Sequence, residues 1–194
     1  MPPLLVPGGE SAVGWLKALN SLKPNLSKRI KALICDGDPH LVHQARLKGW
    51  LIQRCHFHLL ASIKNYVTAG PLSRNQTFGK LVLRTVQKTI SNLKTPDVNE
   101  LWSLVRLAKN PKLRGRLRGL IKNLDDFRTY LRYPELNLPT TSNSAESLVQ
   151  VVRDLQYRTK GFRTKKSFLR WLNAVCLNKK SMTCNGKNQP IKHG

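Results

Sequence analysis

The stretch RIKALICDGDPHLVHQARLKGWLIQRCHFH, residues 29–58, decides the fold of this 194-residue chain. The apolar run over 29–35 predicts a buried strand, and the DGD after it turns the chain. Asp38 stands before a proline, a pattern typical of a helix N-cap, and Gly49 closes that helix. A second strand is expected over 50–55. Two strands joined by one helix form a parallel pair, so the stretch predicts an α/β layer.

The segments on either side of this stretch are predicted to be helical. A helix over 11–22 has Ser11 as its cap, and another follows the second strand over 56–67. Four more are expected at 74–92, 97–109, 111–123 and 124–132. Helices over 143–156 and 167–178 complete the chain. We therefore expect a helix-rich α/β fold with a partial core (1–67), an all-helical insertion (74–133), a return to the core (138–180) and a disordered tail (181–194).

The charge of the chain points to a polyanionic partner. Thirty-four Lys and Arg stand against ten Asp and Glu, a formal net charge of +24. Such self-repulsion is typical of proteins that bind nucleic acid. The basic residues are interleaved with apolar ones, which favours a folded domain over the low-complexity tails of ribosomal or histone-like proteins.

The sequence predicts a location inside the cell. The N-terminus lacks the pattern of a signal peptide, and no stretch approaches the ~20 apolar residues of a membrane span. Four scattered cysteines favour reduced thiols. We expect a cytoplasmic, DNA-associated protein.

Asp36 is the first candidate functional acid. It stands at the predicted carboxyl end of a strand, where open α/β sheets present ligand sites. Its neighbour Asp38 has a sufficient structural role as a helix cap, whereas the competing interpretation of Asp36 is an ordinary turn aspartate before glycine. We therefore favour Asp36 as the functional residue.

Glu146 is the second candidate acid, and local sequence offers it a purely structural role. Asn143 as N-cap with Glu146 three residues on fits a capping box. Its pairing with Asp36 across a helical insertion, in a chain poor in acids, favours function. Two carboxylates in a basic protein suggest a site that holds divalent cations against a polyanion.

Cys55 and His58 have the spacing of half a zinc site, and His56 adds a third possible ligand. A structural zinc needs a further pair, and Cys176 with Cys184 is loosely spaced. We favour the interpretation that Cys55 is a buried thiol and His58 a helix side chain that braces the neighbouring acidic site.

Two basic segments are candidate phosphate contacts. Residues 109–122 carry six cations and no acid, a pattern equally compatible with a solvated face. The second segment, 158–166, follows the Glu146 helix directly and is placed to hold DNA phosphates beside the metals. Its cations are Arg158, Lys160, Arg163, Lys165 and Lys166.

The chain resembles the catalytic core of DDE transposases of the Mutator-type superfamily, bacterial insertion-sequence members included. The resemblance rests on four motifs in order: ICDGD (34–38), QRCHFH (53–58), NSAES (143–147) and GFRT (161–164). Residues 8–23 are similar to the family's segment before its second aspartate. The resemblance covers residues 8 to about 178.

The resemblance implies a partial RNase H-like core with its early strands missing, in which Asp36 and Glu146 bind two Mg²⁺ or Mn²⁺ ions. Such a pair, roughly 4 Å apart, serves phosphodiester cleavage and strand transfer in DNA transposition. Cys55 and His58 become an accessory motif, and zinc becomes the less favoured metal. The implied partners are transposon ends and target DNA, with a second copy of the chain or a missing N-terminal part.

One departure from the family pattern limits the expected activity. The only acid before Asp36 is Glu10, so the family's first catalytic aspartate has no counterpart here. We therefore expect a transposase fragment that is inactive alone. The alternatives are a non-catalytic basic protein that binds nucleic acid and a zinc-stabilised domain.

Overall fold

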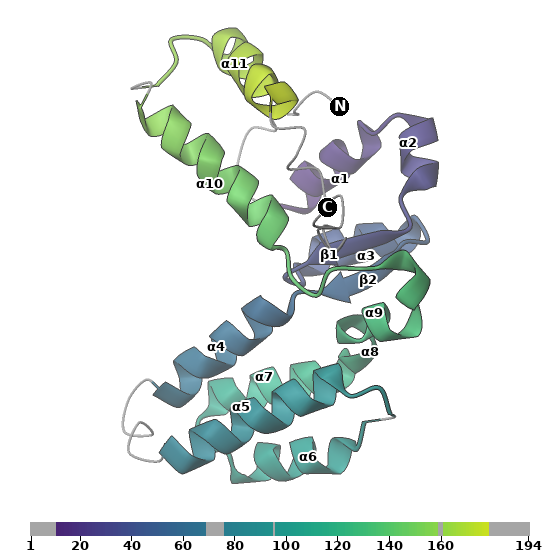
Figure 1. Cartoon of the computed structure of the whole chain (residues 1–194), viewed down its shortest axis with the longest axis vertical. Helices are drawn as coiled ribbons and strands as arrows, with labels where there is room; N and C mark the ends of the chain where they lie inside the picture. Colours follow the sequence, from purple (N-terminus) through teal and green to yellow (C-terminus); the bar gives the residue numbers. More distant parts are fainter. Residues whose placement is uncertain (1–10, 69–75, 95, 159–160, 179–194) are drawn as a thin grey trace, which may run out of the picture. The chain divides into compact units, whose positions relative to one another are not determined.

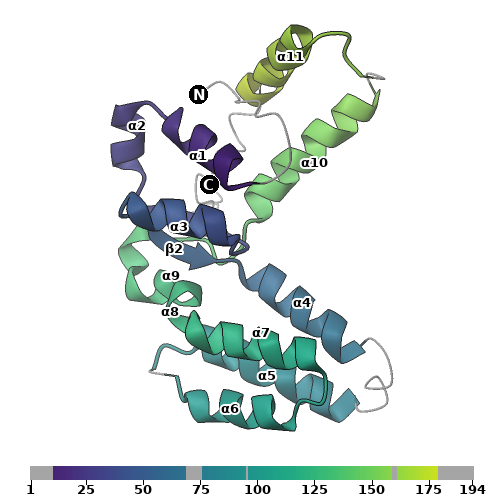
Figure 2. The same cartoon turned by 180° about the vertical axis from the view of Figure 1, so that it is seen from behind.

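The computed structural model describes residues 11–68, 76–94, 96–158 and 161–178. Within these ranges the chain is helix-rich and has one two-stranded parallel sheet. The chain divides into two compact units, Met1–Ser27 with Ser142–Gly194, and Lys28–Thr141. Each unit is described by itself below, and the elements are labelled in Figures 1 and 2.

The sheet belongs to the unit Lys28–Thr141 and confirms the predicted strand, turn, helix and strand. Strands β1 (Ala32–Cys35) and β2 (Leu51–Arg54) pair in parallel, with Ala32 opposite Leu51 and Cys35 opposite Arg54. Helix α3 (Pro39–Leu47) connects them. Strand β1 is shorter than the apolar run at its start, because α2 (Pro24–Arg29) extends to the first residue of that run and pairing begins at Ala32 opposite Leu51.

Most of the predicted insertion packs together with α4 (His56–Thr68) into one helical core within the same unit. The helices from the insertion are α5 (Gln76–Ser91), α6 (Val98–Leu107) and α7 (Pro111–Lys122). Ile63, Val82, Leu101, Leu113 and Leu117 are fully buried in this core. The helices therefore hold together through interleaved aliphatic side chains, as the helical spacing of these residues predicts.

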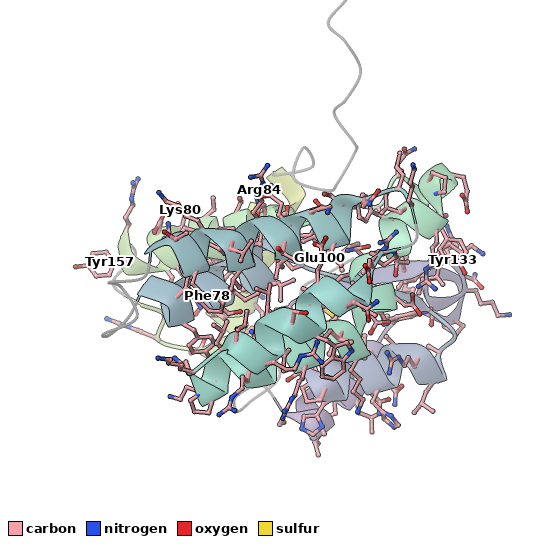
Figure 3. All side chains as sticks on the ribbon, turned by 90° about the horizontal axis from the view of Figure 1, so that it is seen from below. Phe78, Lys80, Arg84, Glu100, Tyr133 and Tyr157 are labelled. Atoms are coloured by element: carbon pink, nitrogen blue, oxygen red, sulfur yellow. The ribbon has the colours of Figure 1, made fainter. Side chains whose placement is uncertain are left out.

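The outer face of α5 is polar. Lys80 and Arg84 project from its surface, whereas Phe78 is half-buried against the aliphatic core (Figure 3). Lys88, on the same helix, forms an ion pair of 3.2 Å with Glu100 of α6. The contrast between the two faces of α5 accounts for its position at the edge of the helical core.

The prediction of a single helix over 124–132 is wrong, because the structure has two short helices there. Helix α8 (Leu124–Phe127) and helix α9 (Thr129–Arg132) meet at Arg128, whose φ of −116° is not helical. The Arg128 side chain is buried and its guanidinium donates hydrogen bonds to three carbonyls at the end of α5. Those acceptors are Thr89 (3.0 Å), Asn92 (2.8 Å) and Lys94 (2.9 Å). A short 3-10 helix, η2 (Pro134–Leu136), follows.

The other unit contains α1 (Ala12–Asn20), α10 (Asn143–Arg158) and α11 (Lys165–Asn178). The Ser11 side chain accepts a hydrogen bond of 3.1 Å from the backbone N–H of Gly14, which confirms the predicted cap of α1. Helix α2 (Pro24–Arg29) was not predicted. Pro24 stands at the first position of α2, where its missing N–H is no loss.

Several predictions of architecture stay predictions. A two-stranded sheet does not establish an RNase H-like core. The division into core, insertion and return also stays a prediction. The predicted disordered tail, 181–194, lies outside the described residues. Among the described helices, none combines the length and apolar character needed to cross a membrane.

Candidate functional site

Asp36 lies exposed in the bend directly after β1. Its Oδ1 accepts a hydrogen bond of 3.2 Å from the backbone N–H of Asp38, so the carboxylate shapes the turn. Asp38 has the capping role predicted for it, because its Oδ1 accepts a hydrogen bond of 2.8 Å from the N–H of Leu41 in α3. The strand end therefore presents the Asp36 carboxylate to solvent and uses Asp38 to start the helix.

Gly37 is required between these two aspartates for two separate reasons. Its φ of +102° lies in the left-handed region, where side chains are strained. An ideal Cβ at this position would also lie 1.8 Å from Nη2 of Arg54. Arg54 Nη2 donates a hydrogen bond of 3.3 Å to the Gly37 carbonyl, and its guanidinium lies 5.1 Å from the centre of the Phe127 ring. The glycine thus lets an arginine pack against the turn that carries Asp36.

A cavity of about 610 Å³ opens beside this turn, within the unit Lys28–Thr141, and we call it the Asp36 pocket. It lies between the end of the sheet, α4 and α7. The lining residues are Asp36, Arg54, Leu59, Tyr66, Lys112, Gly115, Arg116, Gly119, Leu120, Asn123 and Phe127. Three cations and one carboxylate therefore line the space next to the strand end.

Helix α7 contributes the cationic wall of the Asp36 pocket. Lys112, Gly115, Arg116 and Gly119 follow one face of the helix, and the buried leucines at 113, 117 and 120 follow the other. A Cβ added at either glycine would meet no atom within 4 Å. A glycine inside a helix costs about 1 kcal/mol relative to alanine, so packing does not account for these two residues.

Sequence reasoning treated the 109–122 segment as a run of charge and did not single out Lys112, Arg116 or Arg54. Lys112 and Arg116 have helical spacing with Gly115 and Gly119, and a stripe of leucines follows a different face. This spacing could have placed the two cations on one face of the helix. Arg54 could not be found this way, because its neighbours in the pocket come from α7 and α8.

The side chains of Cys35 and Cys55 are both buried. The backbone N–H of Cys55 donates a hydrogen bond of 2.7 Å to the Cys35 carbonyl, which extends the pairing of the two strands. Burial raises the pKa of the Cys35 thiol to about 11, so this side chain is a neutral thiol at physiological pH. The burial of Cys55 agrees with the favoured interpretation of a structural thiol.

His58 stands on the first turn of α4, half-buried, with its ring edge toward Phe57 at 5.7 Å between ring centres. It belongs to the same unit as Asp36, but neither His58 nor Cys55 is among the residues that line the Asp36 pocket. The second cysteine pair proposed for zinc cannot be placed, because the Cys176 side chain and Cys184 lie outside the described residues.

Two other residues of the QRCHFH motif join β2 to α8 and α9. The fully buried Gln53 donates from Nε2 to the Phe127 carbonyl (3.1 Å), and its Oε1 accepts from the Tyr130 N–H (2.9 Å). His56 Nε2 lies 2.7 Å from the same Phe127 carbonyl, which can only accept, so Nε2 carries the proton. Burial lowers the pKa of His56, and this hydrogen bond opposes the shift.

Glu146 lies exposed on the first turn of α10, in the other unit. The helix begins at Asn143, so the prediction that Asn143 is the N-cap is wrong, and Ser142 precedes the helix instead. The Ser142 hydroxyl donates to Glu146 Oε1. The Glu146 N–H in turn donates to the Ser142 carbonyl at 3.1 Å. The carboxylate is thus oriented by the residue in front of its own helix.

The GFRT motif shapes the turn between α10 and α11. Gly161 has a φ of +93°, and the Phe162 ring packs against Phe168 and Trp171, at 5.3 and 4.9 Å between ring centres. The Thr164 hydroxyl accepts a hydrogen bond of 3.1 Å from the Ser167 N–H and so caps α11. The motif therefore has a structural explanation in which its glycine, phenylalanine and threonine each take part.

The cations predicted to contact phosphates surround this turn. Arg158 ends α10, and Arg163, Lys165 and Lys166 are exposed. Lys160 lies outside the described residues. Two lysines in the first turn of a helix without an acid there oppose the helix dipole, an arrangement that a bound anion relieves.

A family model described as "Transposase, Mutator family" matches residues 3–183 of the chain. The chain therefore belongs to the Mutator family of transposases, which makes DNA its partner. No curated protein and no solved structure matches the chain significantly.

The packing of Arg54 on Gly37 predicts an energetic coupling between the two residues. Gly37→Ala adds a clash with Arg54 to the strain of a positive φ, whereas Gly49→Ala, at a φ of +71° with no atom within 4 Å, adds strain alone. Strain of this kind costs about 1–2 kcal/mol. We expect Gly37→Ala to lower the free energy of unfolding by about 1 kcal/mol more in the native chain than in a chain that already carries Arg54→Ala, as measured by urea unfolding. The same cycle with Gly49→Ala should give no coupling. A coupling that is equal in both cycles contradicts the close packing.

The lowered pKa of His56 predicts how stability depends on pH. The folded-state pKa lies below the unfolded value of 6.5, so the unfolded chain binds the proton first as the pH falls. The contribution of neutral His56 is fully present above about pH 7 and is lost as the pH falls through 6.5 toward the folded pKa. Urea unfolding at several pH values should show a flatter profile for His56→Gln than for the native chain. His43→Gln, at an exposed position, should leave the slope unchanged. An unchanged slope in His56→Gln contradicts the prediction.

Proposed function

We propose that this chain forms part of a transposase catalytic domain that cleaves DNA strands and transfers them, with Asp36 and Glu146 as ligands of divalent cations. One observation carries the proposal. In a chain that belongs to the Mutator transposase family, an exposed aspartate stands at the carboxyl end of a parallel strand, beside a pocket lined by three cations.

The chemistry of Asp36 fits Mg²⁺ or Mn²⁺. Hard divalent cations prefer carboxylate oxygens, and among the described residues the only bond of this carboxylate is the one from the Asp38 N–H to Oδ1. Oδ2 is therefore available as a ligand. A bound Mg²⁺ or Mn²⁺ ion would stabilise the attacking and leaving oxygens when a phosphodiester is cleaved. Zinc is the less favoured metal, because the thiols at the strand ends, Cys35 and Cys55, are buried.

The role of Glu146 rests on the NSAES motif and on its placement. The residue opens α10, and the hydroxyl of Ser142 orients one of its carboxylate oxygens. A ligand held by a second residue loses less side-chain freedom on binding a metal. The predicted phosphate contacts follow Glu146 in the chain and would hold the DNA backbone: Arg158, Lys160, Arg163, Lys165 and Lys166. Cys55 and His58 would act as an accessory motif near the strand end.

This chain alone should cleave little or no DNA. The sequence before Asp36 has Glu10 as its only acid, so two carboxylates are available where the DDE pattern has three. Two ligands bind metal more weakly and leave one ion poorly placed. A second copy of the chain or a further segment would have to complete the site.

The second candidate function is a non-catalytic protein that binds nucleic acid. The turn bond between Asp36 and Asp38 favours it, because that bond gives Asp36 a structural role that needs no metal. The basic residues would then bind DNA by charge alone. The two functions differ in whether divalent cations strengthen the binding of DNA.

Binding of a DNA duplex with Ca²⁺ or with EDTA, followed by fluorescence anisotropy, separates the two functions. Ca²⁺ can bind carboxylate ligands without supporting the cleavage of DNA strands. It should strengthen DNA binding by the native chain because it removes the repulsion between the carboxylates and the phosphates. Asp36→Asn should bind about equally well with Ca²⁺ and with EDTA. Asp97→Asn, which keeps an oxygen for the cap of α6, is the matched control and should behave as the native chain.

Three outcomes would count against the proposal. Equal binding by the native chain in Ca²⁺ and EDTA favours the non-catalytic function. A response of Asp97→Asn like that of Asp36→Asn shows a general effect of charge. Robust Mg²⁺-dependent nicking by the chain alone, abolished in Asp36→Ala, would overturn the expectation that it is inactive by itself.

A further inference from the structure

The Asp36 pocket is lined by more positive than negative charge. Three cations, Arg54, Lys112 and Arg116, line it with one carboxylate, Asp36, and the Asp126 carboxylate also stabilises the charge of Arg54. None of the three cations forms an ion pair among the described residues, where Asp126 pairs with Arg46 at 2.7 Å and Glu100 with Lys88 at 3.2 Å. Cations gathered without counter-charges repel one another, and an anionic ligand removes that repulsion.

Both arginines of the pocket are held in place by uncharged partners. Arg116 Nε donates a hydrogen bond of 2.8 Å to the Ser62 hydroxyl of α4, and that hydroxyl donates to the Leu59 carbonyl, also at 2.8 Å. Arg54 is held by the Gly37 carbonyl and the Phe127 ring. A guanidinium fixed at one edge keeps its other N–H groups for a ligand and loses little freedom on binding it.

The start of α7 adds a third cation in an unfavourable position. Lys112 lies in the first turn, where the helix dipole is positive and no acid is present. The Asn110 side chain caps the helix by accepting from the Lys112 N–H at 2.9 Å. A lysine here is stabilised by an anion close to the helix start, and the helix face with Gly115 and Gly119 leaves space for one.

We propose that the Asp36 pocket binds a phosphate of the DNA backbone, held by Lys112 and Arg116 with Arg54 behind them, so that α7 forms part of the DNA-binding surface. This inference rests on the proposed function, because DNA is taken as the substrate. Lys112 and Arg116 are exposed, so an extended polymer can reach them. Asp36 at the rim disfavours a small free anion, whereas a backbone phosphate is held by its neighbouring contacts as well.

The test compares arginines on two faces of α7. Arg116→Ala removes a cation from the pocket, and Arg114→Ala removes an exposed cation of the same helix that does not line it. We expect Arg116→Ala to weaken binding of a DNA duplex about tenfold in anisotropy, and Arg114→Ala to weaken it less than about twofold. The slope of log K against log salt should fall by about 0.9 in Arg116→Ala alone, as for one lost phosphate contact.

A second variant fills the space and leaves every charge in place. Gly119→Leu puts an aliphatic side chain on the pocket face of α7, where a Cβ would meet no atom within 4 Å, and leucine favours the helix. We expect a higher Tm and weaker DNA binding. Circular dichroism of both variants shows whether the fold is kept, so that a loss of binding is not confused with unfolding.

The outcomes separate this inference from the proposed function. Equal losses in Arg116→Ala and Arg114→Ala, or unchanged binding in Gly119→Leu, overturn the pocket as a phosphate site and leave metal-dependent binding untouched. A selective loss in Arg116→Ala without any effect of Ca²⁺ supports the pocket and rejects the metal ligands. Competition by millimolar inorganic phosphate equal to that by unlabelled DNA would show a site for small anions instead. Failure of the native chain to bind DNA overturns both.

Discussion

The buried amide of Gln53 is the interaction on which the unit Lys28–Thr141 depends. It stands on β2, is fully buried, and satisfies the Phe127 carbonyl and the Tyr130 N–H of two short helices more than seventy residues away. The Thr129 hydroxyl adds a bond to the Ile52 carbonyl of the same strand. A buried polar group left without partners costs about 1–3 kcal/mol, so this contact specifies where α8 and α9 must lie. The Phe127 ring in turn packs against the Arg54 guanidinium, and both residues line the Asp36 pocket.

The same contact explains how a short sheet and a helical core together produce a functional edge. The strand end presents Asp36, and α7 faces it with cations and two glycines that have no packing role. Elsewhere on the described surface the internal ion pairs are few relative to a net charge of +24. A family of transposases acts on DNA, a partner that neutralises such charge. Under our proposals, the acidic ligands and the cations of the Asp36 pocket would bind the same polyanion, the acids through metal ions and the cations directly.

Local patterns predicted the elements whose causes are local, and failed where the cause is distant. The cap at Asp38, the turn at Gly37 and the parallel pair of strands follow from adjacent residues, so they were predicted. The break at Arg128 was missed because it depends on carbonyls at the end of α5. His56 was interpreted as a possible zinc ligand and Gln53 only as part of the QRCHFH motif, since nothing nearby in sequence shows that both bond to Phe127. Asp36 was located by its strand end, whereas Arg54 beside it became visible only through packing.

We propose that Asp36 and Glu146 bind the same divalent cations when DNA is bound. Replacing Mg²⁺ by Fe²⁺ with ascorbate generates radicals at the metal, and mass spectrometry of the fragments locates where the chain is cut. Two cuts are expected, one beside Asp36 and one beside Glu146, both suppressed by excess Mg²⁺ and both absent in Asp36→Asn. Cleavage confined to the neighbourhood of Cys55 and His58, or a cut beside Glu146 that persists in Asp36→Asn, would contradict it.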